Sequence, residues 1–585
     1  MLFTNTRNLA CAYVRAKGGI VNFKDYTLKL VYECKGKTKW LIDESDDIIS
    51  FSEVGDEEHI KLIVQATEPV KILRAQLIFD HYFESDEWFF GGGYQSWSNT
   101  KEYRKGDRQY GLRFPCNVIN LAKTIATATG DYHFAEYGKD LYHSHAYTYI
   151  RKGDQLDFFG TLNDRTGYTV FYADMRENVF AIEKDVEGVT VDGEYELFDV
   201  MHCHGTYEQV FDRYFEEYPK KATGRVDRLA GYTSWYNYSQ NITEDVIVRD
   251  LNGLYEKAGD TANIFQIDDG YESKVGDWLT VKPEFPNGMG YLADEIHKKG
   301  YKAGLWLAPF VAQFKAQIVK EHPDWFIKDE YGKKVVGGIA WKGFYILDIE
   351  NQEVKEYIKH VLDVVLNEWH YDMVKLDFLF AVAIQPRNGK SRGQIMHEAM
   401  DFLRECCGDK IILGCGAPLV ASFGVVDACR IGCDVELSFK DKFYTKITNQ
   451  EIISTKMAMN NSVFRRHLNG RIFANDPDVF FLRDGGVTPV DYTWEQKELL
   501  AKINNMFGSV LFVSDNAGEY DEEKTDLLIK SFKKFEGKVI SAEYITNKEN
   551  GGEFIAIEYQ ENGENKCLTY NTITGKYTDS LIETE

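Results

Sequence analysis

Aspartate residues recur at the ends of apolar, strand-like runs in the middle of the chain. They are Asp268 and Asp269, Asp377, Asp434, Asp476 and Asp478, and Asp515. A carboxylate flanked by Ile, Leu, Val and Phe is costly to bury without a partner. Two facing carboxylates are the minimal equipment for glycoside hydrolysis, because one attacks the anomeric carbon and the other protonates the leaving oxygen. The alternative is that these residues form ion pairs at the rim of the fold, and their spacing leaves both interpretations open.

Residue alternation along a strand gives two of these aspartates a charged neighbour. In VKLDF, Lys375 and Asp377 are two residues apart and face the same side, where the ammonium favours the ionised carboxylate. In CRIGCDVE, Arg430 and Asp434 share one face, and the two cysteines of that run share the other. The pattern predicts that the charged residues face a pocket and that the thiols pack against a helical layer.

The elements that must position these residues are eight strand-like runs that alternate with amphipathic helical segments. The runs are 231–238, 263–269, 302–310, 373–380, 410–416, 429–436, 471–480 and 509–515. This alternation predicts parallel βα units closed into a (β/α)8 TIM barrel, whose chemistry collects at the C-terminal ends of the strands. A doubly wound open sheet is disfavoured, because no strand is followed by a Gly-rich phosphate-binding turn.

Regions of short alternating strands flank the barrel, so we expect a multidomain chain. Residues 1–222 predict an N-terminal antiparallel β-sandwich domain, which ends in a charged stretch with Pro and Gly. Residues 223–520 form the predicted catalytic barrel. Residues 521–585 return to alternation after a helix-like segment and predict a small C-terminal β domain.

Charge and motif content narrow the classes of partner and cofactor. The formal net charge of −24 disfavours nucleic acid and anionic membrane surfaces and is compatible with a neutral small-molecule substrate. The chain has no HExxH, GxSxG or P-loop motif, and its strand ends carry no histidines, so we expect neither a metal nor a cofactor. A homo-oligomer is compatible with the sequence but is not indicated by it.

The cysteines and the N-terminal residues bear on location. Ten cysteines occur without a CxxC motif or paired spacing, which disfavours both a zinc site and a disulfide framework. The first 19 residues lack the apolar core and cleavage site of a secretory signal, and no stretch approaches the length of a membrane span. We therefore expect a cytoplasmic protein with reduced thiols.

Nine motifs stand in order along the chain: GYQSWS (93–98), SWYNYSQNITE (234–244), QIDDGYE (266–272), GDWLTVKPEFPNGM (276–289), GLWLAPF (304–310), KLDFLF (375–380), ILGCGAPL (412–419), RIGCD (430–434) and NDPD (475–478). Through these motifs, and over essentially its whole length, the chain resembles the bacterial α-galactosidases of glycoside hydrolase family 36, particularly the shorter members. One departure is Cys433, since family members carry proline at the position before the residue that Asp434 matches.

The resemblance implies a retaining exo-glycosidase that removes terminal α-galactosyl residues from melibiose- or raffinose-type sugars, with Asp377 as nucleophile and Asp434 as acid/base. It also implies eight substrate-binding residues: Asp268 and Asp269 at the 4- and 6-hydroxyls, Lys375 at the 3- and 4-hydroxyls, Cys415 and Arg430 around the 2-hydroxyl, Trp235 and Trp306 in the pocket walls, and Trp97 reaching over from the N-terminal domain.

Three alternatives stay open at this point. Two are enzymes of the same family, an α-N-acetylgalactosaminidase or an α-galactosyl transferase. The resemblance of Cys415 and Arg430 to residues around a free 2-hydroxyl leaves little space for an N-acetyl group, which favours the galactosidase. The third is a non-catalytic carbohydrate-binding protein, and the presence of both Asp377 and Asp434 argues against it.

Overall fold

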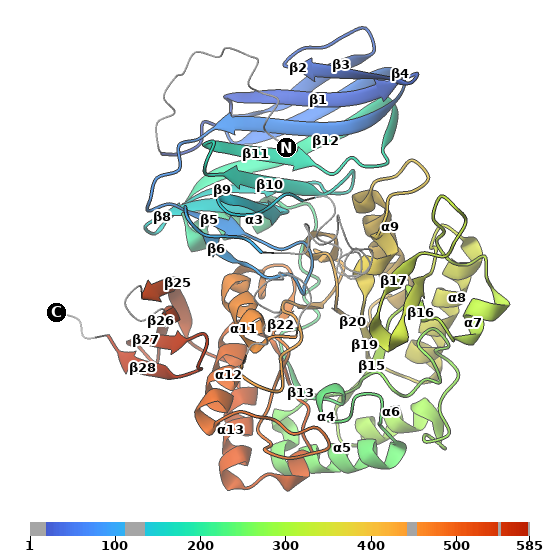
Figure 1. Cartoon of the computed structure of the whole chain (residues 1–585). Coiled ribbons are helices and arrows are strands. Elements are labelled where there is room, and N and C mark those ends of the chain that lie inside the picture. Colours follow the sequence, from blue (N-terminus) through green and yellow to red (C-terminus); the bar gives the residue numbers. More distant parts are fainter. Residues whose placement is uncertain (1–18, 111–134, 441–452, 548–551, 583–585) are drawn as a thin grey trace.

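A closed barrel of parallel strands forms the centre of the computed structural model, which describes residues 19–110, 135–440, 453–547 and 552–582 (Figure 1). Consecutive strands are neighbours, and the last pairs with the first. The predicted (β/α)8 fold is therefore confirmed. The strands are β13 (Leu229–Thr233), β14 (Ile264–Ile267), β15 (Lys302–Leu307), β19 (Met373–Leu376), β20 (Ile411–Gly414), β21 (Ala428–Arg430), β22 (Ala474–Asp476), β23 (Val479–Phe480) and β24 (Val510–Val513).

The seventh barrel strand is broken into β22 and β23. β22 pairs with β21 and β23 pairs with β24, so the two pieces together close the barrel. Pro477 and Asp478 stand at the break. Proline has no N–H for a sheet hydrogen bond, and Asp478 has a positive φ of 79°. Because of this break, the direction of the Asp478 side chain does not follow the alternation expected of one continuous strand over 471–480.

The helices outside the barrel begin at well-defined caps. The side chains of Thr243, Ser391, Thr493 and Asp521 each accept a hydrogen bond from a first-turn amide. None of the described helices is both long and apolar enough to cross a bilayer. The main helices are α5 (Glu244–Ala258), α6 (Gly288–Lys298), α8 (Gln352–Asp363), α9 (Arg392–Cys407), α11 (Thr455–Phe464), α12 (Trp494–Phe507) and α13 (Glu522–Phe532).

The third barrel strand is followed by an insertion that the sequence patterns do not predict. It contains α7 (Gln317–Glu321) and a three-stranded antiparallel sheet of β16 (Val311–Gln313), β18 (Phe344–Ile346) and β17 (Val336–Gly338). These strands have only three residues each, too few for alternation to be recognised. The insertion matters because it brings further side chains to the mouth of the barrel.

The N-terminal region is a twelve-stranded antiparallel sheet folded into two layers, as the sandwich prediction requires. The long strands β4 (His59–Asp80) and β12 (Thr190–Thr206) join the layers, and their apolar faces enclose one core. The other strands are β1 (Tyr26–Cys34), β2 (Lys37–Ile42), β3 (Ile49–Asp56), β5 (Trp88–Gly91), β6 (Lys101–Tyr103), β7 (Leu141–His145), β8 (Tyr147–Lys152), β9 (Gln155–Thr161), β10 (Thr169–Asp174) and β11 (Val179–Lys184).

Strand β4 shows how the sandwich is folded. It runs without interruption from His59 to Asp80 and passes the exposed Pro69. The register against β12 shifts between Val191 and Gly193, opposite this proline. A bulge accommodates a residue without an N–H, so the strand bends between the layers instead of ending.

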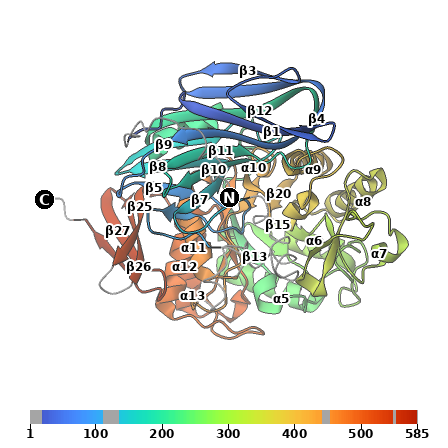
Figure 2. The same ribbon diagram turned by 45° about the horizontal axis from the view of Figure 1, so that its top comes forward.

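The N-terminal sheet lies against the barrel (Figure 2), and α3 (Tyr207–Glu217) lies between them (Figure 1). His467 of the barrel stacks on Phe211 of α3, with ring centroids 3.9 Å apart. Its ring nitrogens contact the hydroxyls of Tyr207 and Tyr147, each at 2.7 Å. Buried apolar residues of both regions form one continuous cluster. The sheet is therefore fixed on the barrel.

The C-terminal region is a four-stranded antiparallel sheet that lies beside α12 (Figure 1). Gln496 of α12 donates to the Thr574 carbonyl oxygen at 2.7 Å. The last strand is mostly exposed and polar and therefore has no recognisable alternation. The predicted domain limits at 222/223 and 520/521 stay predictions. The strands are β25 (Lys538–Asn547), β26 (Gly552–Glu561), β27 (Glu564–Asn571) and β28 (Tyr577–Leu581).

Candidate active site

Asp377 is held in a fixed orientation at the C-terminal end of β19. One carboxylate oxygen accepts a hydrogen bond from Trp306 Nε1 at 3.0 Å, and the other accepts one from the Phe378 amide at 2.7 Å. Its own amide donates to the Leu307 carbonyl oxygen at 2.8 Å. Phe378 has a φ of 54°, which turns the chain away from the strand. Both oxygens of this buried carboxylate are thus oriented by the barrel.

Lys375 pairs directly with Asp268 and not with Asp377. Its Nζ lies 2.9 Å from Asp268 Oδ2, and both residues are buried. Burial would raise the pKa of Asp268, but the Lys375 charge lowers it below the usual range. The strand pattern correctly puts Lys375 and Asp377 on one side, but the long ammonium side chain reaches across to β14. Its effect on Asp377 is a longer-range attraction.

Burial is the largest influence on Asp377 itself. It raises the pKa of this carboxyl, while the Lys375 charge and the hydrogen bonds from Trp306, Cys415 and the Phe378 amide lower it. Cys415 follows β20, and its amide donates to the Leu376 carbonyl oxygen at 2.8 Å. The buried thiol is therefore a neighbour of the Asp377 carboxylate, in the position that the sequence motifs predict for a site residue.

Asp269 lies at the end of β14 and is held by three side chains that sequence reasoning missed. Gln240 Nε2 lies 2.9 and 3.0 Å from its two oxygens, and Trp341 Nε1 donates to Oδ2 at 2.8 Å. Glu272 also hydrogen-bonds this carboxylate. Burial and the neighbouring Asp269 charge raise the pKa of Glu272 well above its usual range. The protonated form of Glu272 is therefore favoured beside the Asp269 carboxylate.

Trp341 belongs to the insertion after the third strand. Its ring centroid lies 6.0 Å from that of Trp306 and 4.8 Å from that of Phe378, so it lies over the Asp377 end of the site. It has a φ of 52°. The available sequence signal was the length of the connection 308–351, which is far longer than an ordinary βα loop and therefore indicates function.

Arg430 organises the opposite side of the mouth. Its Nη2 atom lies 2.8 Å from Asp434 Oδ1, 2.5 Å from Asp478 Oδ2 and 3.3 Å from the Tyr236 hydroxyl. Tyr236 also donates to Asp478. Burial raises the pKa of Asp478 to about 7, even though the Arg430 charge lowers it. One guanidinium therefore serves two carboxylates and a phenol.

Asp434 lies in the loop after β21, not within a strand as the sequence pattern suggests. Its side chain is 27% exposed, whereas Arg430 is almost fully buried. The Ser454 amide donates to the Asp434 carbonyl oxygen at 2.9 Å. The buried thiol of Cys433 contacts the Ser454 carbonyl oxygen at 3.5 Å. Ser454 thus contacts Asp434 through the main chain and Cys433 through its thiol.

Four of the charged groups at this mouth lie near the Cys415 thiol. Lys375, Asp377, Arg430 and Asp434 all interact electrostatically with Cys415, whose pKa burial raises well above its usual range. The sequence-predicted catalytic pair and its two basic residues are therefore brought together around one residue. Cys429 of β21 and Cys433 of the following loop each place the thiol against a backbone carbonyl oxygen. Cys429 is buried and contacts a backbone carbonyl oxygen, in agreement with packing.

Trp97 reaches the barrel from a loop of the N-terminal region. Its ring packs edge-on against Phe378 and Phe380, with centroids 5.2 and 5.6 Å away, and lies against Gly416. Arg465 of the barrel fixes this loop, since its guanidinium donates to the carbonyl oxygens of residues 93, 95, 96 and 98. Trp97 Nε1 is buried without a hydrogen-bond partner among the described residues.

The remaining predicted residues divide between site and scaffold. Trp235 begins α4 (Trp235–Tyr238) directly after β13 and is half-buried at the same mouth. Asp476 accepts a hydrogen bond from the Asp478 amide at 2.9 Å. Asp515 forms an ion pair with Arg483 and accepts two backbone hydrogen bonds at 2.7 and 2.9 Å. Asp515 therefore has the structural role that the rim alternative describes.

Comparisons with known proteins find sequence likeness over part of the chain. The Melibiase family model matches residues 242–401. The curated α-galactosidase Mel36A of Lactobacillus acidophilus is 32% identical over 121 residues, which are 20% of this chain and 16% of that protein. The chain thus matches only about a sixth of that curated relative's length.

Solved structures extend the likeness to the whole chain. The α-galactosidase TtGalA of Thermus thermophilus, solved with p-nitrophenyl α-D-galactopyranoside, has a TM-score of 0.67 and 24% identity, over 88% of this chain and 96% of that one. The family 36 α-galactosidase AgaA of Geobacillus stearothermophilus has a TM-score of 0.56 and 10% identity, over 96% of this chain and 87% of that one. The resemblance predicted from the motifs is confirmed: residues 242–401 match the Melibiase family, and the chain has the architecture of glycoside hydrolase family 36 α-galactosidases.

Proposed function

We propose that this protein is a retaining exo-α-galactosidase in which Asp377 is the nucleophile and Asp434 the acid/base. Asp377 attacks the anomeric carbon, and Asp434 protonates the glycosidic oxygen as the bond to the leaving group breaks. The product of this step is a covalent galactosyl-enzyme. Asp434 then removes a proton from water, which attacks the same carbon and releases α-galactose.

The observation that carries the proposal is the different environment of the two carboxylates. Asp377 is buried, and both its oxygens accept hydrogen bonds from fixed N–H donors. This geometry suits a nucleophile that must stay aligned with one carbon atom. Asp434 is partly exposed, which suits a group that exchanges protons with a leaving group and with water, and Arg430 fixes one of its oxygens.

The side of the mouth formed by β14 and β19 accounts for selectivity. Asp268 is an ionised acceptor fixed by Lys375, and Asp269 is oriented by Gln240 and Trp341. By resemblance they bind the 4- and 6-hydroxyls. A buried carboxylate that loses its hydroxyl partner is left unsatisfied, so the pair rejects a sugar with an equatorial 4-hydroxyl. Terminal α-galactosides are therefore the substrate class.

Two measurements test the activity and its stereochemistry. The purified protein should hydrolyse p-nitrophenyl α-galactoside faster than p-nitrophenyl α-N-acetylgalactosaminide, because Cys415 and Arg430 enclose the space expected for the 2-hydroxyl. Proton NMR during the first turnovers should show α-galactose as the first product. A preference for the N-acetyl substrate would favour the α-N-acetylgalactosaminidase, and β-galactose as the first product would exclude the retaining mechanism.

A cytoplasmic location belongs to this proposal, and it rests on cysteine usage. The eight cysteines within the described residues are unpaired, and several of them are buried. Residues 1–18, and with them Cys11, lie outside the described residues, as does Cys116. Fractionation of the native source cells should recover the activity with cytoplasmic markers.

A further inference from the structure

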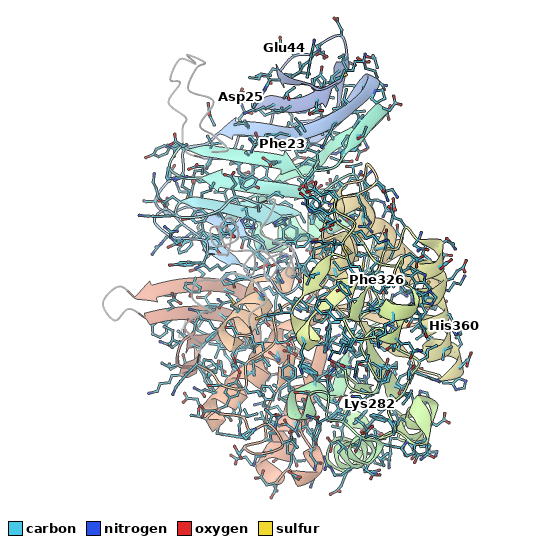
Figure 3. The ribbon with its side chains drawn as sticks, turned by 45° about the vertical axis from the view of Figure 1, so that its right-hand side comes forward. Phe23, Asp25, Glu44, Lys282, Phe326 and His360 are labelled. Atoms are coloured by element: carbon cyan, nitrogen blue, oxygen red, sulfur yellow. The ribbon has the colours of Figure 1, made fainter. Side chains whose placement is uncertain are left out.

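A cavity of about 400 Å³ adjoins the Asp269 side of the barrel mouth. We call it the lysine cavity, because Lys274, Lys282, Lys315 and Lys342 line it together with Glu272 and Trp341. Two of these lysines come from residues 273–282, after the second strand, and two come from the insertion after the third. Lys282 lies in the half of the molecule away from the N-terminal sheet (Figure 3).

The charge of this cavity is unusual for a chain with a net charge of −24. Within the described part of the chain, none of the four lysines forms an ion pair with a carboxylate, whereas most buried carboxylates of the barrel mouth have a basic partner. The half-buried Lys282 donates to the carbonyl oxygens of Gly270 at 2.6 Å and Gln240 at 3.3 Å. Its ammonium is thus fixed at the wall without being neutralised.

Glu272 adds a polar group that lacks a partner. It is 1% exposed, and its Oε1 atom has no hydrogen-bond partner among the described residues. Burial and the Asp269 charge raise the pKa of Glu272, which favours its neutral form, so Glu272 itself does not neutralise the lysines. A hydroxyl or a protonated phosphate oxygen would satisfy Oε1. The wall therefore fits a ligand that brings both a donor and anionic oxygen atoms.

The position of the cavity determines which part of a substrate would reach it. Gln240, Glu272 and Trp341 line the cavity and also hydrogen-bond Asp269, so the cavity and the sugar-binding carboxylate share a wall. Asp269 follows the second strand, and Asp434 follows the sixth, on the opposite side of an eight-stranded barrel. The leaving group lies on the Asp434 side, so the cavity faces the galactosyl unit itself.

We propose that the lysine cavity binds an anionic ester group, a phosphate or a sulfate, carried on the 6-oxygen of the terminal galactosyl unit. Such an ester keeps the free 4-hydroxyl for recognition, and Asp269 keeps its hydrogen bonds from Gln240 and Trp341. The protein then accepts charged α-galactosides as well as neutral ones. This proposal rests on the proposed function, because it assumes that Asp269 faces the 6-position. It adds a substrate class that the two catalytic aspartates do not specify.

The test compares p-nitrophenyl α-galactoside with its 6-phosphate and 6-sulfate esters in two proteins. One is the wild type, and the other is the triple variant Lys274→Gln, Lys315→Gln, Lys342→Gln. We expect the wild type to cleave at least one ester with kcat/KM within about tenfold of the neutral substrate. Since charged contacts act mainly on binding, the variant should raise KM for that ester by ~10-fold or more and leave the neutral substrate unchanged. Lys320→Gln, an exposed lysine outside the cavity, is the matched control.

The outcomes separate failure of this proposal from failure of the proposed function. If the wild type cleaves the neutral substrate but neither ester, or if the triple variant treats ester and neutral substrates as the wild type does, the cavity proposal is wrong. If inorganic phosphate alone changes cleavage of the neutral substrate through the same lysines while the esters are refused, the cavity binds a free anion and the proposal is again wrong.

If the neutral galactoside is not cleaved, the proposed function fails instead. Calorimetric titration with galactose 6-phosphate then tests the cavity directly. Binding that the triple variant loses would support an anionic sugar at this site, and no binding by the wild type would overturn it.

Discussion

The buried carboxylates on the two sides of the barrel mouth have different kinds of partners. On the side of β14 and β19, each carboxylate has its own partners: Asp268 pairs with Lys375, Asp269 lies beside Glu272, and Asp377 accepts hydrogen bonds from Trp306 and the Phe378 amide. On the side of β21, Arg430 alone serves Asp434 and Asp478. The first side is rigid and closed, and the second leaves Asp434 partly exposed.

This difference separates recognition from proton transfer. One-to-one pairing fixes both the position and the charge of the groups that bind the sugar, because removing one partner leaves the other unpaired. A shared guanidinium tolerates a change of charge on one carboxylate, because it keeps its ion pair with the other carboxylate. In the proposed mechanism Asp434 changes its protonation state during the reaction, and it lies on the side with the shared guanidinium.

The largest expected effect distinguishes the nucleophile from all other aspartates. Asp377→Asn should lower kcat by ~10⁴-fold or more, because the amide cannot form the galactosyl-enzyme. Asp434→Asn should lower it less for p-nitrophenyl α-galactoside, whose leaving group needs little protonation. Steady-state kinetics on both variants measures this, with circular dichroism to verify folding. An Asp377→Asn variant as active as the wild type would overturn the nucleophile assignment.

The second prediction concerns stability and compares one partner from each side. Asp268→Asn should lower the free energy of unfolding by about 3–5 kcal/mol, because Lys375 loses its only close carboxylate partner among the described residues. Asp478→Asn should cost less, because Arg430 keeps Asp434. Urea unfolding of the two variants is the measurement. Equal losses would contradict the distinction between paired and shared charge.

The third prediction is a pH dependence that only one side should show. Since burial raises the pKa of Asp478 to about 7, the folded protein holds this proton between pH 4 and 7 while the unfolded chain releases it. The stabilisation from this group is present below pH 4 and is lost as pH rises through 7. The cost of Asp478→Asn should therefore fall by about 2 kcal/mol between pH 5 and pH 8.

Asp268 provides the contrasting case. Lys375 lowers its pKa below the usual range, so its contribution is present above the unfolded pKa and is lost only as pH falls through the folded value. The cost of Asp268→Asn should be constant between pH 5 and pH 8. Urea unfolding at several pH values tests both variants, and parallel pH curves would refute the assignment of the two environments.

The smallest expected effects come from two tryptophans that each donate a hydrogen bond to one carboxylate. Trp306 donates to the proposed nucleophile and Trp341 to Asp269, which we propose binds the sugar. Trp306→Phe removes a donor to Asp377 and should lower kcat by ~10-fold with KM nearly unchanged. Trp341→Phe removes a donor to Asp269 and should raise KM by a similar factor. If both variants changed only KM, Trp306 would be a binding wall and not a positioning residue.

The sequence predicted the strands of the barrel and the charged residues at the strand ends. It predicted less well which side chains form ion pairs and hydrogen bonds with those residues. Alternation and strand–helix order are local patterns, so Asp377 and Arg430 could be located from them. The pairing of Lys375 with Asp268 depends on the reach of a long side chain across two strands. The support of Asp269 depends on Trp341, which lies in an insertion with strands too short to recognise. Such contacts arise only from the tertiary arrangement.

The break in the seventh strand is a similar case. A run of residues 471–480 looks like one continuous strand, but Pro477 interrupts it and Asp478 turns toward Arg430. Proline was the available signal, and its consequence for the Asp478 side chain could not be derived without the neighbouring strands. Asp478 consequently lies beside Asp434 and Arg430 in the structure, a position that strand alternation did not indicate.

Covalent trapping of the intermediate tests the central claim most directly. The protein would be incubated with a fluorinated α-galactosyl fluoride that slows hydrolysis of the galactosyl-enzyme, and peptides would then be analysed by mass spectrometry. We predict one added fluorogalactosyl group per chain, on the peptide that contains Asp377, and none in Asp377→Asn. A label on another carboxylate, such as Asp434 or Asp268, would contradict the assignment of Asp377 as the nucleophile.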